Sequence, residues 1–237
     1  MRLVCLLLAF GMITACSSKG DEPDMLELKG VYQLNFPEAS GLTYDDASHS
    51  LLTVSDDSSL NKQVFRLDLE GNIIEEFSIS GYNLEAVAIK PPDNSIWVAD
   101  EETAYVFPLD DPEAGFVIPA ALEGNSGIEG IAYAEQILYI LKEKDPSVLF
   151  IANPDGTIID TLSLDFTSDL SDLEYDRANK RLLLLSDQDK KLFILDDSFN
   201  PIKSYSLEIE KPEGLAVSSD GSDIYIACDK TSKLYLY

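Results

Sequence analysis

A short phrase that occurs five times constrains the fold of this chain more than any other feature. Each copy holds a small or acidic residue followed by an apolar, strand-forming run. The five copies are Ser40-Gly41-Leu42-Thr43-Tyr44, Glu85-Ala86-Val87-Ala88-Ile89, Glu129-Gly130-Ile131-Ala132-Tyr133, Ser171-Asp172-Leu173-Glu174-Tyr175 and Glu213-Gly214-Leu215-Ala216-Val217. Their second residues stand 45, 44, 42 and 42 positions apart. This period is typical of a four-stranded propeller blade.

A second phrase follows each copy and strengthens the repeat. It is an apolar run with β-type residues that ends in an acid. The closing acids are Asp56, Asp100, Glu143, Asp187 and Asp229. A carboxylate at the end of a strand accepts hydrogen bonds from turn amides, so we expect a structural role for this set.

The two phrases together predict an all-β chain that forms a five-bladed β-propeller. The expected blades cover residues 40–80, 84–122, 128–164, 170–207 and 212–237. The last of them has only three strands, so we expect the N-terminal strand Gly30–Leu34 to complete it and close the ring. Trp97 and the run Leu182–Leu185 are expected between blades, where strands are apolar on both faces.

Composition limits the partners of the domain. The 237 residues include 17 Lys and Arg against 43 Asp and Glu, a net charge of −26. Such a surface repels phosphate backbones and anionic headgroups, so no nucleic acid is expected to bind and cations are favoured. The repeat predicts one propeller domain over residues 26–237, and we expect a monomer.

The N-terminus is typical of an exported protein. Residues 1–15 combine a basic start with a short apolar run, which predicts a signal peptide. Ile13-Thr14-Ala15-Cys16 resembles the lipobox of bacterial lipoproteins, which implies lipidation of Cys16, a polar tether over residues 16–25 and an envelope location, by analogy the outer membrane. An ordinary secretory signal is the alternative. Cys228 is then the cysteine left in the domain, and we expect it to be buried and free.

Eight segments of the domain form an ordered set of motifs, namely Glu38–Tyr44, Val54–Asp57, Leu84-Glu85, Gly127–Tyr133, Lys142–Pro146, Asp169–Ser171, Leu185–Asp187 and Pro212–Ala216. This ordered set resembles that of the SdiA-regulated (YjiK-like) family of bacterial envelope propellers. The resemblance implies a five-bladed propeller, distantly related to NHL-repeat propellers, with a bound calcium ion. It implies no assigned activity.

Five carboxyl groups are expected to converge on the axis, because the first strand of each blade lines the central channel. Glu85, Glu129 and Glu213 occupy one position of the phrase, where the other two blades have Ser40 and Ser171. In those blades an acid stands two residues earlier, Glu38 or Asp169, on the same face of an extended strand. The candidate metal ligands are therefore Glu38, Glu85, Glu129, Asp169 and Glu213, with Ser40 and Ser171 as further channel-lining residues.

A ring of five acids must bind protons or a cation, because like charges so close cannot all stay ionised. Hard oxygen donors without histidine or thiolate select calcium or magnesium, and calcium tolerates the irregular geometry of such a ring better. The alternative is that these side chains cap backbone amides or face water.

Two functions remain open from the sequence. The first is a lipid-anchored, calcium-binding propeller that acts as a binding or scaffold module for an unknown small-molecule or protein ligand. The second is a calcium-dependent hydrolase of the lactonase or gluconolactonase type, in which carboxylates and often a histidine activate water. The chain has a single histidine, His49, in an expected exposed turn.

Overall fold

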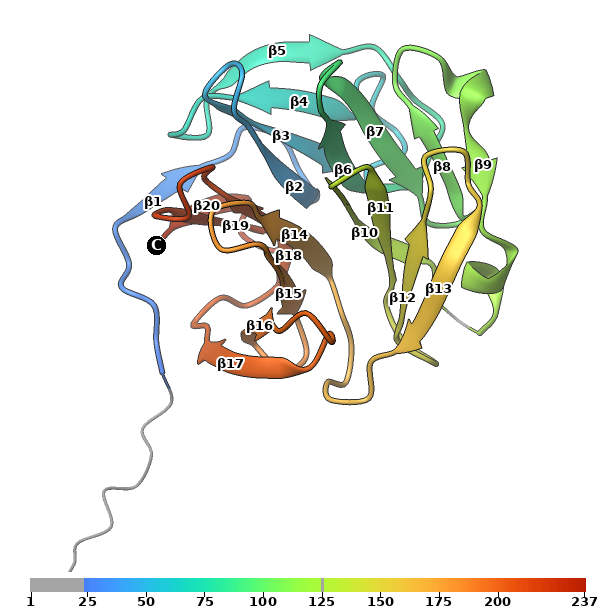
Figure 1. Cartoon of the computed structure of the whole chain (residues 1–237). Helices are drawn as coiled ribbons and strands as arrows, with labels where there is room; N and C mark the ends of the chain where they lie inside the picture. The colour runs from blue at the N-terminus through green and yellow to red at the C-terminus, as the bar shows by residue number, and fades with distance from the viewer. Residues whose placement is uncertain (1–23, 125) are drawn as a thin grey trace, which may run out of the picture.

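The computed structural model describes residues 24–124 and 126–237. The predicted signal peptide, Cys16 and most of the predicted tether lie outside the described residues. The described chain forms five four-stranded antiparallel sheets around a central axis, which confirms the predicted five-bladed β-propeller (Figure 1).

Each blade runs from an inner strand at the axis to an outer strand at the rim. Blade one contains β2 (Ala39–Asp45), β3 (Ser50–Ser55), β4 (Val64–Leu67) and β5 (Ile73–Phe77). Blade two contains β6 (Leu84–Lys90), β7 (Ser95–Asp100), β8 (Tyr105–Pro108) and β9 (Phe116–Val117). Blade three contains β10 (Ile128–Ala134), β11 (Ile137–Lys142), β12 (Val148–Ala152) and β13 (Ile158–Ser163). Blade four contains β14 (Asp172–Asp176), β15 (Arg181–Ser186), β16 (Lys191–Leu195) and β17 (Pro201–Ser206).

Blade five joins the two ends of the described chain. It contains β18 (Pro212–Val217), β19 (Ile224–Cys228) and β20 (Lys233–Leu236), with β1 (Gly30–Gln33) as its outer strand. β1 pairs antiparallel with β20 in the register Tyr32↔Leu234, which confirms the predicted closure by the N-terminal strand. The chain before β1 also touches blade four, since Met25 forms a parallel bridge with Ser206 at the end of β17.

The core lies between neighbouring blades. Leu182 and Leu184 pack toward blade three and Leu183 and Leu185 toward blade five, as predicted for a strand covered on both faces. Trp97 is 5% exposed and packs among residues of blades two and three, again as predicted.

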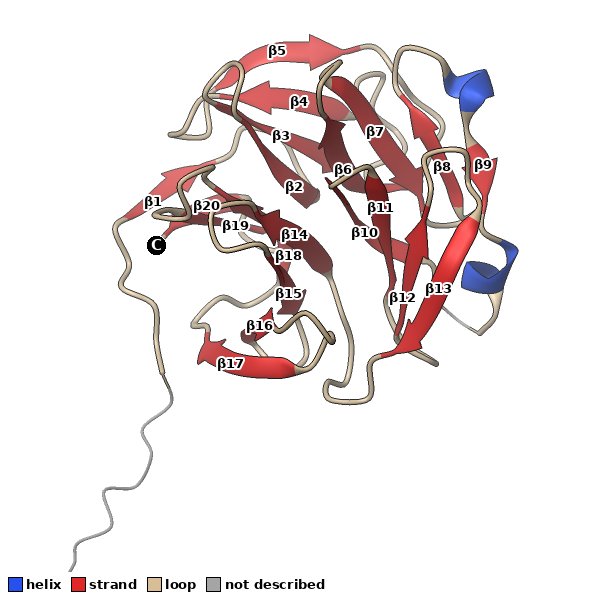
Figure 2. Cartoon of the chain, in the orientation of Figure 1, coloured by secondary structure: helices blue, strands red, loops and turns tan. Residues whose placement is uncertain are grey.

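Blade two departs from regular strands at its rim. Its outer strand β9 has two residues and lies between two short 3-10 helices, η1 (Pro112–Ala114) and η2 (Pro119–Leu122) (Figure 2). Proline suits the first turn of a helix but cannot donate to a sheet ladder, which accounts for the local change. None of the helices in the described part of the chain is long and apolar enough to cross a membrane.

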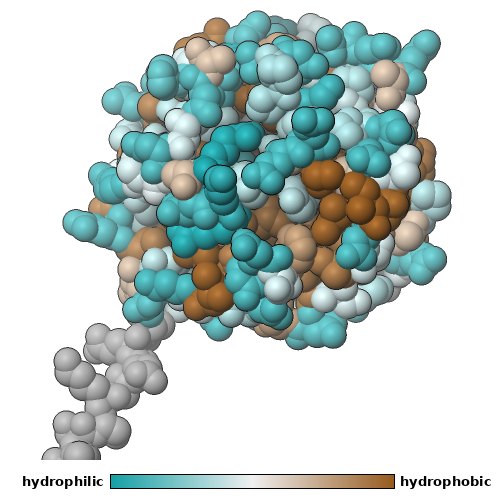
Figure 3. Space-filling model, in the orientation of Figure 1, coloured by the Kyte–Doolittle hydropathy of each residue, from teal (hydrophilic) through white to brown (hydrophobic). Residues whose placement is uncertain are grey.

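Two single residues behave as expected. His49 is exposed in the turn between β2 and β3, and Cys228 is buried as a free thiol. Hydrophilic side chains cover most of the face seen in Figure 3, with apolar side chains gathered toward the right of the view.

Candidate functional site

An acidic cavity of about 300 Å³ lies where the inner strands begin, at one end of the central channel. Antiparallel pairing brings the start of each inner strand beside the end of the next strand, as Leu84 and Asp100 show by pairing directly. Both acidic sets found in the sequence therefore meet here. The carboxyl groups that line the cavity belong to Glu38, Asp56, Glu85, Glu129, Glu143, Asp169, Asp187, Glu213 and Asp229.

Three of the predicted residues are placed by a backbone irregularity. The pairing register of the inner strand shifts at Glu85 in blade two, at Glu129 in blade three and at Glu213 in blade five. A β-bulge leaves one residue without a partner and re-aims its side chain. The repeated bulge thus turns one glutamate of each of these blades toward the cavity.

Glu38 and Asp169 reach the cavity in a different way from that predicted. Glu38 precedes β2 and has a positive φ of 51°, so the alternation of an extended strand does not apply to it. Asp169 precedes β14 and is 2% exposed. Its carboxylate accepts hydrogen bonds from Ser186 Oγ at 2.5 Å and from the backbone N–H of Gln188 at 3.1 Å.

Ser40 and Ser171 line the cavity as expected, but both are engaged by the backbone. Ser40 Oγ donates to the Glu85 carbonyl at 3.1 Å. Ser171 Oγ accepts from the Asp187 N–H at 3.0 Å. Each serine therefore fixes the chain beside an acid that also lines the cavity.

The second acidic set only partly follows its expected role. Asp100 caps its turn, with Oδ1 accepting from the Thr103 N–H at 2.8 Å and Oδ2 from the Asn83 N–H at 2.8 Å. The other four members line the cavity instead. The sequence pattern held a signal for these four acids: in an antiparallel blade the end of the second strand lies beside the start of the inner strand, so both acidic sets are expected at the same end of the channel.

Lysines neutralise part of the negative charge of the cavity on the side of blades three, four and five. Lys144 pairs with Glu143, Lys190 with Asp187, and Lys211 with Asp229. Lys211 Nζ also lies 3.5 Å from Glu213 Oε1. The neighbouring carboxylates raise the pKa of Lys211, which therefore stays charged.

Five of the lining carboxyl groups have no such partner in the described chain: four lie on blades one to three, and the fifth, Asp169 of blade four, is held by hydrogen bonds from Ser186 and Gln188 instead. Among the described residues, no lysine or arginine lies within ion-pair distance of Glu38, Asp56, Glu85 or Glu129. Asp56 Oδ1 is buried and accepts no hydrogen bond from a donor in that part of the chain, and the side-chain partner of Asp56 is another carboxyl group, that of Glu38. An unpartnered buried oxygen is costly and calls for an explanation.

Crowding and burial raise the pKa of several of these groups. Burial raises the pKa of Glu85 and of Glu129 well above the usual value, and nearby carboxylates add to the effect. Burial, with Glu38 beside it, raises the pKa of Asp56 to about 7. Burial also raises the pKa of Glu213 to about 7 although Lys211 opposes the change. The cavity therefore favours a positive charge or retained protons.

The donor set fits a hard cation chemically, but the arrangement is not a finished coordination sphere. Carboxylate and hydroxyl oxygens line the cavity, and the buried Asp56 Oδ1 could coordinate a cation. Within residues 24–124 and 126–237, however, no group of three or more His, Cys, Asp or Glu side chains is arranged to hold a metal ion. A bound cation would require these side chains to turn toward it.

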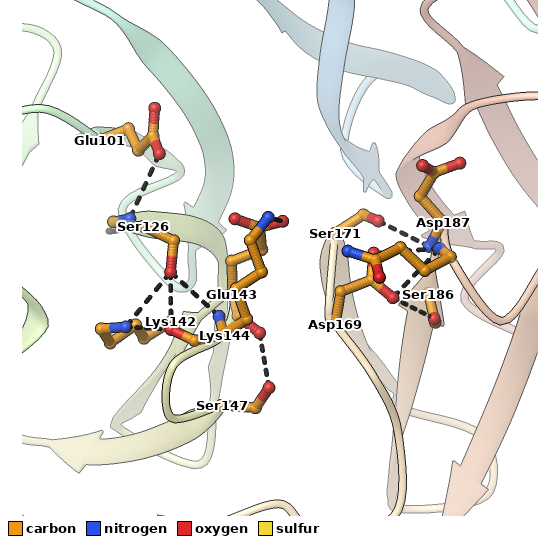
Figure 4. Close-up of polar contacts among 12 residues, drawn as sticks. Glu101, Ser126, Lys142, Glu143, Lys144, Ser147, Asp169, Ser171, Ser186 and Asp187 are labelled. Atoms are coloured by element: carbon orange, nitrogen blue, oxygen red, sulfur yellow. Dashed lines mark hydrogen bonds and ion pairs between the residues drawn. The ribbon is translucent and has the colours of Figure 1, made fainter. Parts of the chain in front are cut away.

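The turn after β11 is held by a buried lysine. Lys142 is 1% exposed and donates to Ser126 Oγ at 3.2 Å and to the Pro146 carbonyl at 3.3 Å, and it also contacts the Lys144 carbonyl. Figure 4 shows this group on one side of the view and the contacts of Asp169 on the other. Burial lowers the pKa of Lys142. Its contacts fix the turn that carries Glu143 to the cavity.

Two further acids lie in the channel and were not predicted. Asp172 Oδ2 accepts from the Leu215 N–H at 2.7 Å and from the Leu42 N–H at 3.1 Å. Glu174 Oε2 accepts from Thr43 Oγ1 at 2.8 Å. Asp172 thus links the inner strand of blade four to those of blades one and five, and Glu174 links it to that of blade one.

Comparison with known proteins agrees with this architecture. The model of the SdiA-regulated family matches residues 25–236. The chain belongs to the SdiA-regulated family. This confirms the resemblance seen in the motifs of the sequence.

Solved structures resemble this SdiA-regulated protein in fold. A streptogramin B lyase structure has a TM-score of 0.53 at 15% identity, over 88% of this chain and 72% of that one. The Cps50 (Swd1) β-propeller domain from Myceliophteria thermophila has a TM-score of 0.51 at 11% identity, over 85% of this chain and 65% of that one. At such identities the likeness concerns the fold alone.

Proposed function

We propose that this propeller binds a calcium ion in its acidic cavity and acts as a lipid-anchored binding module of the bacterial envelope. The observation that carries the cation proposal is the group of four carboxyl groups on blades one to three that lack a basic partner among the described residues, Glu38, Asp56, Glu85 and Glu129. They come from three consecutive blades and line one side of the cavity. The ion is therefore expected off the axis, toward blades one to three.

Charge supports a divalent ion over a proton alone. The pKa of Asp56 is raised to about 7, so neutral solution leaves part of this group ionised beside Glu38 and Glu85. A divalent cation would stabilise the ionised form of such closely spaced carboxyl groups and offset the cost of burying their charge.

Donor type supports calcium over other metals. The lining offers carboxylates and hydroxyls, and neither His49 nor Cys228 belongs to it. Calcium accepts six to eight oxygen ligands in flexible geometry, whereas magnesium requires a near-ideal octahedron. Because the side chains must turn inward to reach the ion, we expect modest affinity.

Anchoring through Cys16 and an outer-membrane location rest on the sequence pattern of residues 1–25 and remain part of the proposal.

His49 lies outside the cavity lining, so a histidine-assisted hydrolase gains no support from this geometry.

Calorimetric titration of chelator-treated protein with calcium tests the cation proposal, with magnesium as the control ion. We expect saturable calcium binding that weakens by about tenfold or more in Glu129→Gln, because that substitution removes one ligand charge. The exposed Glu208→Gln serves as the matched control and should bind like the wild type. Folded protein that takes up no calcium would refute the proposal.

A further inference from the structure

A second cavity lies on the opposite face of the propeller, between blades three and four. It measures about 370 Å³. Its residues come from the end of inner strand β14, from the first halves of β11 and β15, and from the turns between β10 and β11, β14 and β15, and β16 and β17. The acidic cavity, in contrast, lies where the inner strands begin. We call it the tyrosine cavity, after Tyr139 and Tyr175 in its lining.

The repeat provides an internal comparison for these two rings. Tyr139 of β11 and Tyr175 of β14 stack with centroids 6.3 Å apart and planes at 4°. Tyr225 of β19 and Tyr44 of β2 occupy the equivalent positions between blades five and one, also with centroids 6.3 Å apart. There Tyr225 is 2% exposed, as expected of a ring with a purely structural role. Tyr139 instead is half-buried and faces a cavity.

Phe199 supplies a third ring at a backbone position that normally favours glycine. The turns before the outer strands of blades one and three place Gly71 and Gly156 at φ of 82° and 84°. Blade four has Phe199 at the corresponding place, with φ of 61°. A left-handed conformation is unfavourable for a residue that carries a Cβ atom. Phe199 is thus retained at a conformational cost, with its ring 6.3 Å from that of Tyr139 and tilted by 52°.

The polar lining of the tyrosine cavity has mixed charge. Glu135 and Asp197 contribute negative charge, and Lys180 and Arg181 contribute positive charge. Arg181 uses Nε to pair with Asp176 at 3.1 Å. Asp196, also in the lining, accepts hydrogen bonds from the backbone of its own turn. No single sign of charge dominates the lining, so it has no strong preference for an ion.

We propose that the tyrosine cavity binds a neutral saccharide. The faces of aromatic rings carry partial negative charge and attract the weakly positive C–H groups of a sugar ring. Carboxylates and a guanidinium at the rim supply acceptors and donors for its hydroxyl groups. Aromatic walls with a few polar groups are typical of small-molecule pockets, and about 370 Å³ accommodates one or two sugar units. This inference depends on the fold and not on calcium binding.

Saturation-transfer NMR on residues 24–237, which contain all five blades, tests the inference. The probes are glucose, galactose, N-acetylglucosamine, maltose and cellobiose, each at millimolar concentration, with choline as an organic cation for comparison. We expect transfer to at least one sugar and none to choline. In Phe199→Gly the affinity for that sugar should fall by about tenfold, since one aromatic wall is lost.

Two controls separate binding from folding. Phe199→Gly introduces the residue that blades one and three use, so relief of the left-handed backbone offsets the lost packing of the ring, and we expect a melting temperature close to that of the wild type. Tyr205→Leu removes a partly buried ring of the same blade outside the cavity and should leave sugar binding unchanged. Absence of transfer to all five sugars, binding of choline alone, or sugar binding that Phe199→Gly does not weaken would each overturn the inference.

Discussion

The carboxyl group of Asp172 lies where the inner strands of blades one, four and five converge. It accepts hydrogen bonds from the backbone N–H groups of Leu42, Leu173 and Leu215, one in each of these blades. The inner edge of an inner strand has no neighbouring strand, so its N–H groups need another acceptor. Asp172 provides one acceptor for three blades.

Small residues in the other copies of the repeat leave room for this side chain. The position of Asp172 is occupied by Gly41, Ala86, Gly130 and Gly214 in the other blades. A Cβ atom on Gly130 would lie 3.0 Å from Asp172 Oδ1 and 2.9 Å from the Leu173 nitrogen. The sequence shows that Asp172 differs from its counterparts in the repeat. Its hydrogen bonds to Leu42 and Leu215 were not predictable, because these residues are 130 and 43 positions away and come close only when the ring of blades closes.

Replacing Asp172 with alanine is expected to lower the free energy of unfolding by about 3 kcal/mol, because buried N–H groups lose their acceptor. Urea unfolding followed by the fluorescence of Trp97 measures this, since Trp97 is the single tryptophan and is buried. Asp160→Ala, at an exposed site of β13, is the control and should change stability by less than about 0.5 kcal/mol. Equal stability of the two variants would mean that water replaces the carboxylate in the channel.

At the scale of elements, the N-terminal strand connects two blades. Residues 24–29 run from the edge of β17 to β1 along the rim of the propeller (Figure 1). The Lys29 N–H donates to the Leu236 carbonyl at 2.8 Å, and Tyr32 packs on the core shared by blades five and one. Removing this segment would leave blade five with an open edge.

A chain that begins at residue 34 is therefore expected to lose about 4 kcal/mol of stability relative to one that begins at residue 24, from lost strand pairing and apolar burial. The same urea titration of Trp97 fluorescence measures the difference. A synthetic peptide of residues 24–33 added in trans should restore part of the loss. Unchanged unfolding midpoints in the shorter chain would show that β1 contributes no closure.

Strand order was predictable because each blade repeats the same two phrases in the same order. The rim of blade two was not, because β9 has only two residues between turns that start at Pro112 and Pro119. In the candidate site, too, the features that repeat in every blade were predictable and the local ones were not. Convergence of Glu85, Glu129 and Glu213 follows from the repeat, whereas the different orientations of Asp56 and Asp100 depend on hydrogen bonds within their turns.

At the scale of the whole molecule, the acidic charge is unevenly balanced around the axis. Lys144, Lys190 and Lys211 pair with lining acids of blades three, four and five. In the described chain no such lysine pairs with Glu38, Asp56, Glu85 or Glu129, which line the cavity from blades one to three. Asp172 and Glu174 add buried carboxyl groups in the channel, and burial raises the pKa of both. The folded molecule therefore holds protons that the unfolded chain releases.

This imbalance predicts that stability falls as pH rises, which is the reverse of the usual behaviour of paired carboxylates. The pKa of Glu213 is raised from 4.5 to about 7 by burial, so between these pH values the folded state binds more protons than the unfolded state. Stability then decreases with pH across that window. With a chelator present, we expect a melting temperature ~5 °C lower at pH 8 than at pH 5.

Calcium should remove this difference if it binds the same carboxyl groups, because it replaces the protons lost at pH 8 and stabilises the folded state that binds it. Glu129→Gln should also flatten the pH dependence without calcium, since its amide does not ionise; burial raises the pKa of the native Glu129 well above its usual value. Calorimetric melting at pH 5 and pH 8, each with chelator or with calcium, gives the four melting temperatures to be compared. A melting temperature that increases from pH 5 to pH 8 in the chelator would contradict the picture of a cavity short of positive charge.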